Sequence, residues 1–585
     1  MSFQGRDLGR APATQSVSFR VKLPLRNRAE LEQLTTLQAT PGSPLFGHFL
    51  SVAQFRARYG PTPATIARAA RELNAEGFRV SEIDSQSMMA GGTVAAAEAA
   101  FGVRMHALRD RRGRVRVATL DAVRPRPQLA ALGATILGLR DMPRRRAHVR
   151  LASPFNRQST LGNYWFTDLK EAYEYPEYQV GSGKGVTIAT VGVSDFSSAD
   201  ANAYFQHERL GTGNAFLAPQ PTYLHTLMTG YTPFDPTSGD STEADLDVQQ
   251  AGGSASGATI IGIATDGSDA GFVSAYTNID EKKPGFAAQI VSTSYGECEL
   301  IYTAAYNDGQ DETSILTQDY HDAFVQGNAE GITFVTSSGD NAGLDCPQAG
   351  YFTNPEQNAN YLDVPGVEAD ADDPSVVAVG GTNLVTSHVA GSAISTYVSE
   401  NSYDDTIGTD DPYGQGNNVT NELWGSGGGA SQIFNQPTYQ QLVSTGISKR
   451  AVPDVSMHMG GCPSGAESCA PQDSAVQMYL GGSIVAVIGT SAASPDFAGL
   501  LALRLARTGT GLGKANVFLY TVATTNNKPP AYYRQGIPGN DGVVTVKAGT
   551  LGWNQINGLG TPYGETMADE AEHPYAGIPQ TATNP

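Results

Sequence analysis

Cysteine is scarce in this chain, with four residues among 585: Cys298, Cys346, Cys462 and Cys469. None of them forms a Cys-x-x-Cys motif, which excludes the common thiolate metal sites and dithiol redox motifs. Cys462 and Cys469 enclose a short loop of glycine, serine and proline, whereas Cys298 and Cys346 follow two strand-end motifs that should be neighbours in space. We therefore expect two disulfides, 462–469 and 298–346, and an oxidising compartment. Buried free thiols are the alternative.

Long apolar runs are also missing. The chain has no stretch of about 20 apolar residues that could cross a membrane. Its first segment, Met1–Gln15, is polar and lacks the apolar core of a secretory signal peptide. Because of the expected disulfides we predict an extracytoplasmic or secreted protein without a membrane partner. A wrongly chosen start, export by another route or release by lysis would explain why no signal peptide is visible.

Positive charge is scarce and unevenly distributed. The chain has 38 Lys and Arg against 58 Asp and Glu, a formal net charge of −20 at pH 7, and no Lys or Arg lies between Lys283 and Lys449. Residues 1–150 carry 24 basic and 11 acidic residues, or +13, so the remainder carries −33. The anionic part repels itself less when its carboxylates are protonated, which favours acid tolerance. The arginines are not interleaved with aromatic residues, so we expect no nucleic-acid partner.

A strand that turns sharply into a helix is predicted around Ser491. The apolar run 484–488 is followed by Gly489-Thr490-Ser491 and then by Pro495. We expect Pro495 in the first helical turn, where no amide hydrogen is needed. The free N–H groups and the positive end of the helix dipole would surround the Ser491 hydroxyl, as a nucleophilic serine requires. Gly-Thr-Ser alone is a weak motif.

The base that would activate Ser491 is not the histidine of subtilisin-like serine proteases, because none of the nine histidines lies in a His-Gly-Thr-His sequence. The segment 239–252 instead places Glu243 and Asp247 four residues apart, on one face of a predicted helix. Glu243 would take the serine proton, while Asp247 would orient Glu243 and share that proton. A solvated acidic helix is the more common fate of such a pair.

A third segment decides between these interpretations. Residues 331–343 predict a buried strand that runs into a Gly-bounded turn with Asp340 at its tip. With this Ser-Gly-Asp motif the chain resembles, over nearly its whole length, the sedolisin family of serine-carboxyl peptidases. The resemblance implies that the catalytic residues are Ser491, Glu243, Asp247 and Asp340. From connecting segments that match the family, it also implies these substrate-binding residues: Ser292, Ser294, Tyr295, Gly296, Gly427 and Gly428.

Carboxylates in place of histidine suit an acidic working pH. An imidazole with a pKa of about 6.5 is protonated at about pH 4, where a glutamate is poised to accept and return a proton. Asp340 has to be protonated in order to donate a hydrogen bond to an oxyanion, which low pH or burial would achieve. The implied reaction is acyl transfer: Ser491 attacks a peptide carbonyl and Glu243 relays the proton to the leaving amine, while Asp340 and the Ser491 amide hold the oxyanion.

The fold class is predicted as α/β, with the charge step near residue 150 as a domain boundary. We expect a basic pro-domain at 1–150, a processing linker at 151–163 and a peptidase domain at 164–585. Alternating or capped segments predict, in the pro-domain, strands at 16–23, 102–108 and 114–120 and helices at 27–34, 52–59 and 93–101. Two helices on an antiparallel sheet predict an α+β, ferredoxin-like domain similar to the sedolisin pro-domain.

The peptidase part shows buried apolar runs that alternate with helices. The runs are 185–193, 258–264, 288–294 and 332–336, and a helix is expected at 315–330. This order, together with the resemblance, predicts a subtilisin-like, mainly parallel sheet with helices on both faces. Active residues should then lie at the carboxyl ends of its strands, where Ser294, Asp340 and Ser491 fall.

The basic domain has two interpretations, an inhibitory propeptide or a permanent accessory domain. Residues 1–150 carry a net charge of +13 and the remainder carries −33, so the two parts attract each other, which favours the first interpretation. Acid would weaken this electrostatic attraction. We accordingly expect polypeptide substrates, the chain's own pro-domain as intramolecular inhibitor, and a monomer.

One departure from the family concerns calcium. Sedolisins carry a calcium site near the C terminus, but Arg534 and Asn554 stand at the expected aspartate positions. Ca²⁺ prefers carboxylate oxygens, so an arginine there argues against binding and we name no cofactor. Our hypothesis is that Arg534 bridges the loops that calcium would hold, through backbone carbonyls or Asp541. In the alternative alignment, Asp541 is itself a ligand.

Two classes of function therefore remain. The leading one is an acid-active serine-carboxyl endopeptidase made as a zymogen. The alternative is a catalytically silent sedolisin-like binding or scaffold protein with a permanently closed pro-domain, and the altered calcium site speaks for it. The intact set of four catalytic positions opposes that alternative. A conventional Ser–His–Asp hydrolase is disfavoured, because the histidine motif is missing.

Overall fold

The computed structural model describes most of the chain, and every statement below concerns that part. The described residues are 5–110, 113–140, 144–152, 163–177, 181–208, 219–352, 360–388, 395–402, 405–411, 416–461, 474–525 and 531–569.

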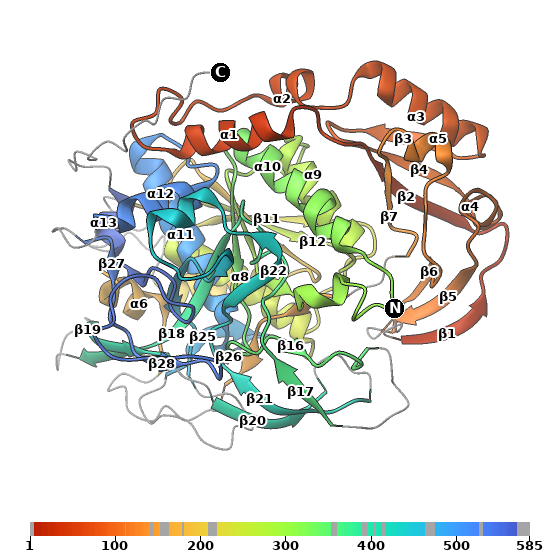
Figure 1. Ribbon diagram of the computed structural model, residues 1–585. Helices are drawn as coiled ribbons and strands as arrows, with labels where there is room; N and C mark the ends of the chain where they lie inside the picture. The colour runs from red at the N-terminus through yellow and green to blue at the C-terminus, as the bar shows by residue number, and fades with distance from the viewer. Residues whose placement is uncertain are drawn as a thin grey trace.

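The N-terminal part is an α+β domain with two antiparallel sheets (Figure 1, red to orange). The larger sheet has the order β3-β4-β2-β7, with the bounds Arg79–Ile83, Ser87–Thr93, Ser16–Lys22 and Thr135–Leu137. The smaller sheet has the order β1-β5-β6, with the bounds Gly5–Arg10, Met105–Asp110 and Val115–Thr119. The helices are α1 (Arg28–Ala39), α2 (Val52–Arg58), α3 (Pro63–Ala75), α4 (Val94–Phe101) and α5 (Pro127–Ala130).

This domain contains elements that the sequence pattern indicated and others that it did not. The predicted strand at 16–23 is β2, and the predicted helices correspond to α1, α2 and α4. The predicted strands near 105 and 117 form a hairpin, but this hairpin pairs with β1 and not with β2. Helix α3 and strands β3, β4 and β7 were not predicted. Phe19, Phe78 and Phe101 meet ring to ring in the core of the domain.

The centre of the larger domain is an eight-stranded, mainly parallel sheet. Its order is β11-β12-β10-β13-β15-β18-β19, and β24 also pairs with β18. In that order the bounds are Thr222–Leu227, Thr259–Ala264, Thr187–Gly192, Ile290–Thr293, Thr333–Ser337, Val377–His388 and Ser395–Asn401, with β24 at Val455–His458. Only the β18–β19 pairing is antiparallel. The four predicted strand runs are confirmed as β10, β12, β13 and β15.

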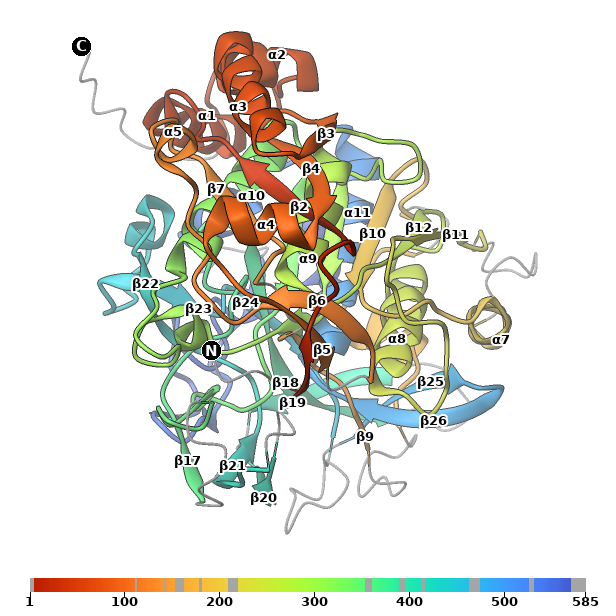
Figure 2. The same ribbon diagram turned by 90° about the vertical axis from the view of Figure 1, so that its right-hand side faces the viewer.

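Helices cover both faces of this sheet, as predicted. Alternate strand residues such as Ile188 and Ala189 enter two separate apolar cores. Helices α8 (Gly239–Ser254) and α11 (Thr490–Thr508) lie on one face, whereas α9 (Asp269–Asp280) and α10 (His321–Ala329) lie on the other (Figure 2). The predicted helix at 315–330 begins with a π-helical turn, Ile315–Tyr320, before α10. The fold is therefore the predicted α/β architecture behind an α+β domain.

Two details around Ser491 differ from the expectation. Ser294 and Asp340 do follow strands β13 and β15 of the main sheet. Ser491 instead follows β26 (Ser483–Ile488), which pairs antiparallel with β25 (Val476–Leu480) in a separate small sheet. Pro495 lies in the sixth position of α11, beyond the first turn, because the helix already begins at Thr490.

The two domains are in close contact. Leu31, Leu34, Phe55 and Tyr59 of the N-terminal domain pack on Val325 and Ala329 of α10. Ion pairs also connect the two domains, and in most of them the cation belongs to the N-terminal domain. These pairs are Lys22–Asp322, Arg28–Asp322, Arg56–Glu281, Arg116–Asp266, Arg140–Glu312 and Arg144–Glu312, and Glu82–Lys283 runs in the opposite sense.

Candidate active site

Helix α8 presents two fully buried carboxylates to the start of α11. The Ser491 hydroxyl donates a hydrogen bond to Glu243 Oε2 at 2.9 Å. One turn further along α8, Asp247 Oδ1 accepts a hydrogen bond from the Ser294 hydroxyl at 2.6 Å. Both carboxylates are at most 2 % exposed. The structure thus brings Ser491, Glu243 and Asp247 into one buried cluster, with Ser294 as a further member.

The electrostatics of this cluster follow from burial. Loss of solvent raises the pKa of Asp247 to about 8, opposed only by the hydrogen bond from Ser294. Burial, followed by the charge of Asp247, raises the pKa of Glu243 well above its ordinary range, and the hydrogen bond from Ser491 opposes this. Two such neighbours titrate as a pair and share a proton over a wide pH range. Each carboxylate accepts one hydroxyl hydrogen bond, Glu243 from Ser491 and Asp247 from Ser294, and each bond favours the charged form of its acceptor.

Asp340 lies against the first turn of α11 from the opposite side. The Thr490 amide and hydroxyl both donate to Asp340 Oδ1, at 2.7 and 2.8 Å. The other oxygen, Oδ2, is buried and has no hydrogen-bond partner. Burial raises the pKa of Asp340 to about 6, although the charge of His148 and the two bonds from Thr490 oppose the shift. Below that pH, Oδ2 can carry a proton and donate it to an oxygen in front of it.

Residues 144–152, which lead out of the N-terminal domain, run through this site. Strand β8 (Arg146–Ala147) pairs antiparallel with β14 (Tyr295–Gly296), and the His148 amide donates to the Ser294 carbonyl at 3.1 Å. Strand β9 (Arg150–Leu151) then pairs antiparallel with β26, immediately before Ser491. The chain therefore changes partner strand between His148 and Arg150.

Gly489 shows how closely this segment approaches the site. A β-carbon at Gly489 would lie 2.0 Å from the His148 carbonyl oxygen and 2.9 Å from Asp340 Oδ2. Its φ of 140° is also one that side-chain-bearing residues rarely adopt. Only glycine leaves room for the carbonyl here, so the His148 carbonyl oxygen and the free oxygen of Asp340 lie beside the same point of the backbone.

The cationic side chains of this segment pair with buried carboxylates of the larger domain. Arg145 is fully buried and donates from both terminal nitrogens to Asp370, at 2.8 and 2.9 Å, with its guanidinium over the ring of Tyr320. His148 Nδ1 and the Ser337 hydroxyl share a hydrogen bond of 2.7 Å, and His148 Nε2 lies 3.4 Å from Glu368. The sequence analysis placed the domain boundary near residue 150 but did not find His148, because its partners lie about 150 to 220 residues away in the chain.

The predicted substrate-binding residues fall into two groups. Ser294, Tyr295 and Gly296 form the strand that pairs with residues 146–148. Ser292, Gly427 and Gly428 do not reach that segment. Ser292 bonds to Ser494 on α11 at 3.0 Å. Gly427 and Gly428 pack against the Ser338 and Gln555 carbonyls, where β-carbons would lie 2.3 and 1.9 Å away, so they support the Asp340 turn.

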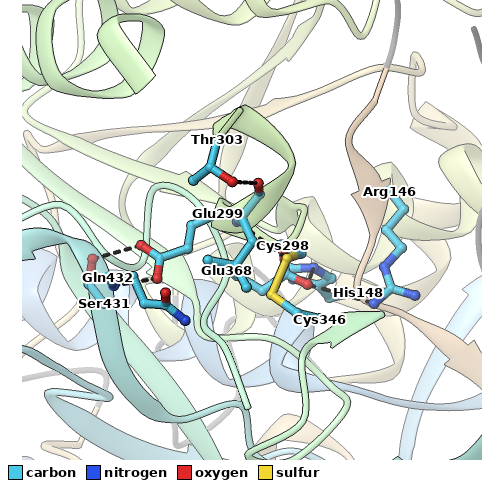
Figure 3. Close-up of a disulfide and its surroundings, with 10 residues drawn as sticks. Arg146, His148, Cys298, Glu299, Thr303, Cys346, Glu368, Ser431 and Gln432 are labelled. Atoms are coloured by element: carbon cyan, nitrogen blue, oxygen red, sulfur yellow. Dashed lines mark hydrogen bonds and ion pairs between the residues drawn. A yellow bond between two sulfur atoms is a disulfide. The ribbon is translucent and has the colours of Figure 1, made fainter. Parts of the chain in front are cut away.

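One of the two predicted disulfides is confirmed. Cys298 and Cys346 are bonded, with their α-carbons 5.0 Å apart. Figure 3 shows this bond beside Glu368, His148 and Arg146. The other predicted pair, 462–469, lies outside the described residues.

Arg534 occupies the region where we expected the calcium site of the family. Its guanidinium is buried and donates to the Pro562 carbonyl at 2.9 Å, the Ala172 carbonyl at 3.1 Å and Glu174 at 2.7 Å. Asp541 is not one of its partners and accepts from Gln555 at 2.8 Å. No group of three or more His, Cys, Asp or Glu in the described part of the chain could hold a metal ion. The residues present at Arg534 therefore do not fit calcium.

Comparisons with known proteins agree with this geometry. Residues 4–131 match the family model "Pro-kumamolisin, activation domain", and residues 229–558 match "Subtilase family". Sedolisin from Pseudomonas sp. (strain 101) is 26% identical over 94% of this chain and 86% of its own length. Kumamolisin from Bacillus sp. (strain MN-32) is 27% identical over 96% of this chain and 92% of its own length. The solved structure of Pseudomonas sedolisin in complex with pseudo-iodotyrostatin shares the fold, with a TM-score of 0.54 and 23% identity over 70% of this chain and 98% of that one.

The fold and its activation domain define a subtilisin-like, serine-type peptidase that is made as a zymogen. The chain belongs to the subtilase family, and its relatives along nearly the whole length place it among the sedolisins with an N-terminal pro-domain.

Proposed function

We propose that this zymogen is an acid-active serine-carboxyl endopeptidase with Ser491 as its nucleophile. The observation that carries the proposal is the 2.9 Å hydrogen bond from Ser491 to Glu243, in a buried site where no histidine contacts the serine among the described residues. Glu243 is the base, Asp247 holds its orientation and shares its proton, and Asp340 with the amide of Ser491 binds the oxyanion.

The proton follows the hydrogen bonds. Ser491 transfers its proton to Glu243 Oε2 as its oxygen attacks the carbonyl carbon of a bound peptide. Asp247 shares a proton with Glu243 and so lowers the cost of charge on Glu243. Glu243 then returns the proton to the leaving amine. Water hydrolyses the acyl-enzyme by the same route in reverse.

Acid is needed because Asp340 acts as a hydrogen-bond donor. An ionised Asp340 would place a negative charge beside a developing negative charge, whereas a protonated one stabilises it. With its pKa raised to about 6, Asp340 is protonated over the acidic range. This proton is the observation that supports an acidic working pH in the proposal.

The N-terminal domain is the intramolecular inhibitor. Residues 144–152 occupy the strand-pairing positions on both sides of Ser491. The buried Arg145–Asp370 pair and the surrounding ion pairs hold the segment in place. Protonation of these carboxylates weakens the clamp in acid, since the cations lose their partners.

No cofactor is part of this proposal. Arg534 joins the loops around residues 172–174 and 562 by hydrogen bonds to two backbone carbonyls and to the Glu174 carboxylate, which is the role that an ion would otherwise fill. Metal analysis of the purified protein is expected to find no stoichiometric calcium. Tightly bound calcium at one equivalent would overturn the assignment to Arg534.

The cellular setting is proposed on the disulfide. A Cys298–Cys346 bond forms and persists in oxidising surroundings, which supports an extracytoplasmic or secreted enzyme. No helix of the described residues is long and apolar enough to span a bilayer.

The deciding experiment measures peptidase activity on a denatured protein substrate from acid to mildly alkaline pH, after acid incubation. Wild type is compared with Ser491→Ala and with Ser494→Ala, a control that removes a buried hydroxyl one turn further along α11. We expect activity confined to acid in wild type and the control, loss of a pro-domain-sized fragment on a gel, and neither in Ser491→Ala. A wild type that stays full length and inactive at every pH would support the scaffold alternative. A neutral optimum would mean that Glu243 is not the base.

A further inference from the structure

Helix α8 has a second polar face that the proposed mechanism does not use. Glu243 and Asp247 belong to the catalytic cluster, whereas Asp245 and Gln249, also four residues apart, share another face of the helix. The Gln249 side chain donates to the Tyr479 carbonyl at 2.8 Å and accepts from the Tyr479 amide at 2.9 Å. The helix that carries the base therefore also holds strand β25.

The turn of the β25–β26 hairpin is anchored by a carboxylate. Gly481 and Gly482 form the two-residue turn between these strands, with φ of 60° and 79°, in the left-handed region that glycine favours. Their amides donate to the two oxygens of Asp200, at 2.8 and 2.7 Å. Asp200 is 2 % exposed and lies on α7 (Ser198–His207), which packs on both α8 and β25 (Figure 2). One buried side chain thus holds both N–H groups of the turn.

Asp245 lies against Asp200. It is 1 % exposed, and its Oδ1 accepts a hydrogen bond from the Ser197 amide at 2.7 Å, whereas its Oδ2 is buried and accepts none. A side-chain hydrogen bond joins the carboxyl groups of Asp245 and Asp200. Two carboxyl groups can form such a bond only when one of them carries a proton. Because Asp200 accepts two amide bonds, which favour its charged form, the proton belongs on Asp245.

The surroundings keep this proton in place. Burial, together with the charges of Asp200 and Asp195, raises the pKa of Asp245 to about 9, although a bond from a backbone amide opposes the shift. Asp195, in the loop after β10, has the His225 ring of β11 as its own partner at 2.6 Å. The hairpin, residues 476–488, contributes no charged side chain. The two carboxyl groups therefore stay bonded through acidic and neutral pH, and repel each other only when the pH rises through about 9.

The position of the hairpin matters because β26 borders the reacting serine. It leads directly into Gly489 and Ser491, and β9, from the segment that leads out of the N-terminal domain, pairs with its last two residues. A peptide substrate in the place of β9 finds the same row of backbone groups. The residues that precede β9 pair with β14 instead. In the same orientation, β26 receives the part of a substrate that follows the reacting carbonyl and leaves with the amine.

We propose that Asp245, bonded to Asp200, is a positioning residue that holds the β25–β26 hairpin as the pairing strand for the leaving-amine side of a peptide substrate. This inference rests on the proposed function, because it needs Ser491 as the nucleophile. Asp245 does not touch the reacting atoms and acts through Asp200 and the two turn amides. Without it, Asp200 is a buried charge that lacks one hydrogen-bond donor and turns away from the hairpin in search of another. Substrates that extend past the scissile bond therefore depend on Asp245 more than substrates with a short leaving group.

The test uses processed enzyme in acid and a series of peptides that share one acyl side, while the leaving side shortens from several residues to one. The measured quantity is the ratio of kcat/KM for the longest peptide to kcat/KM for the shortest. Asp245→Ala should lower this ratio about tenfold or more, mainly through KM. Asp245→Asn should keep it within about twofold of wild type, because the amide donates to Asp200 and accepts from Ser197 at every pH. Glu177→Ala, which removes a carboxylate that is 56 % exposed, is the control and should match wild type.

A ratio that is unchanged in Asp245→Ala, including an equal loss of activity on every peptide, would overturn the inference and leave the proposed function standing. A wild type that cuts neither the peptides nor a denatured protein would instead refute the proposed function.

If Asp245→Ala fails to fold, Asp200→Asn is compared with Asp245→Asn. The new amide at position 200 would turn an NH₂ group toward an N–H group of the turn, so Asp200→Asn should lower the ratio about tenfold while Asp245→Asn does not. Equal ratios in the two variants would contradict the inference. An Asp245→Asn protein that does not fold would contradict it as well, because asparagine supplies the same two bonds.

Discussion

At the scale of single residues, Asp340 has an unusual task for a carboxylic acid. Its Oδ1 is held by Thr490, while its Oδ2 is buried without a partner beside the His148 carbonyl. A carboxyl group donates a hydrogen bond only in its neutral form. An amide in the same place would donate at every pH. Replacing Asp340 by asparagine therefore distinguishes the pH dependence caused by Asp340 from that caused by Glu243 and Asp247.

We therefore expect Asp340→Asn to retain measurable activity and to extend it to higher pH. In wild type, activity should fall as pH rises through about 6, because Asp340 loses the proton that it donates. In the variant that decline should move upward by at least about one pH unit, since the amide does not ionise. The measurement is kcat/KM from pH 3 to pH 8, with Asp345→Asn as the control. A decline at the same pH in both enzymes would show that another group sets it.

At the scale of elements, the strands of the main sheet could be predicted because burial on both faces demands largely apolar runs such as 186–193 and 259–264. Helix α8 could be predicted because i and i+4 carboxylates share a face. Strand β3 was missed since it is largely exposed and polar, and β4 since it contains Gly91 and Gly92, which weaken a strand pattern. Helix α3 carried a signal, with Thr62 as its cap and Pro63 in its first position, that was not used.

Some residues of the candidate site lie in short sequence motifs, whereas others are placed there only by pairing between segments far apart in the chain. Ser491, Glu243 and Asp340 lie in short motifs whose chemistry is legible from spacing. The roles of His148 and Glu368 depend on pairings between segments about 150 and 220 residues apart, and such pairings leave no local pattern. The placement of Ser491 after an edge hairpin, instead of a strand of the main sheet, also depends on pairing alone.

The Cys298–Cys346 bond connects the segments that follow β14 and β15. It closes a loop with a sequence separation of 48 and lies against Gly366, at the start of the turn that carries Glu368. Chain entropy predicts that Cys298→Ser/Cys346→Ser lowers the free energy of unfolding by about 4 kcal/mol. Urea denaturation in the Ser491→Ala background, oxidised against double variant, measures this. An unchanged midpoint would mean that the bond contributes no net stability.

At the scale of the whole molecule, an excess of buried carboxylates sets how stability depends on pH. Burial raises the pKa of Asp319 to about 6 and those of Glu297 and Glu330 to about 8, in addition to Asp247 and Asp340. The folded state therefore binds more protons than the unfolded chain between about pH 4 and pH 8. Stability from these groups is fully present below their unfolded pKa and is lost as pH rises through the folded values. Two groups oppose this trend in acid. The pKa of Glu32 is lowered to about 2 by His321, Lys514 and Arg28 against the cost of burial, and burial lowers the pKa of His458 to about 3.

We accordingly expect the melting temperature of full-length Ser491→Ala to be roughly 5 °C or more higher at pH 4.5 than at pH 8.5. Calorimetry at constant ionic strength measures it. Glu330→Gln, which removes one of the titrating groups, should reduce the difference. A melting temperature that rises with pH would contradict the argument.

The anchoring of Arg145 has a consequence for timing. Any cut of the chain beyond Arg145 leaves Arg145 attached to a whole domain whose helices pack on α10. A short peptide product would diffuse away at once, but this product stays until the domain itself departs. Breaking the chain and opening the site are then separate events, so full-length protein would disappear from a gel before activity toward other substrates begins. The time between these two events measures how long the cleaved domain stays bound to the enzyme.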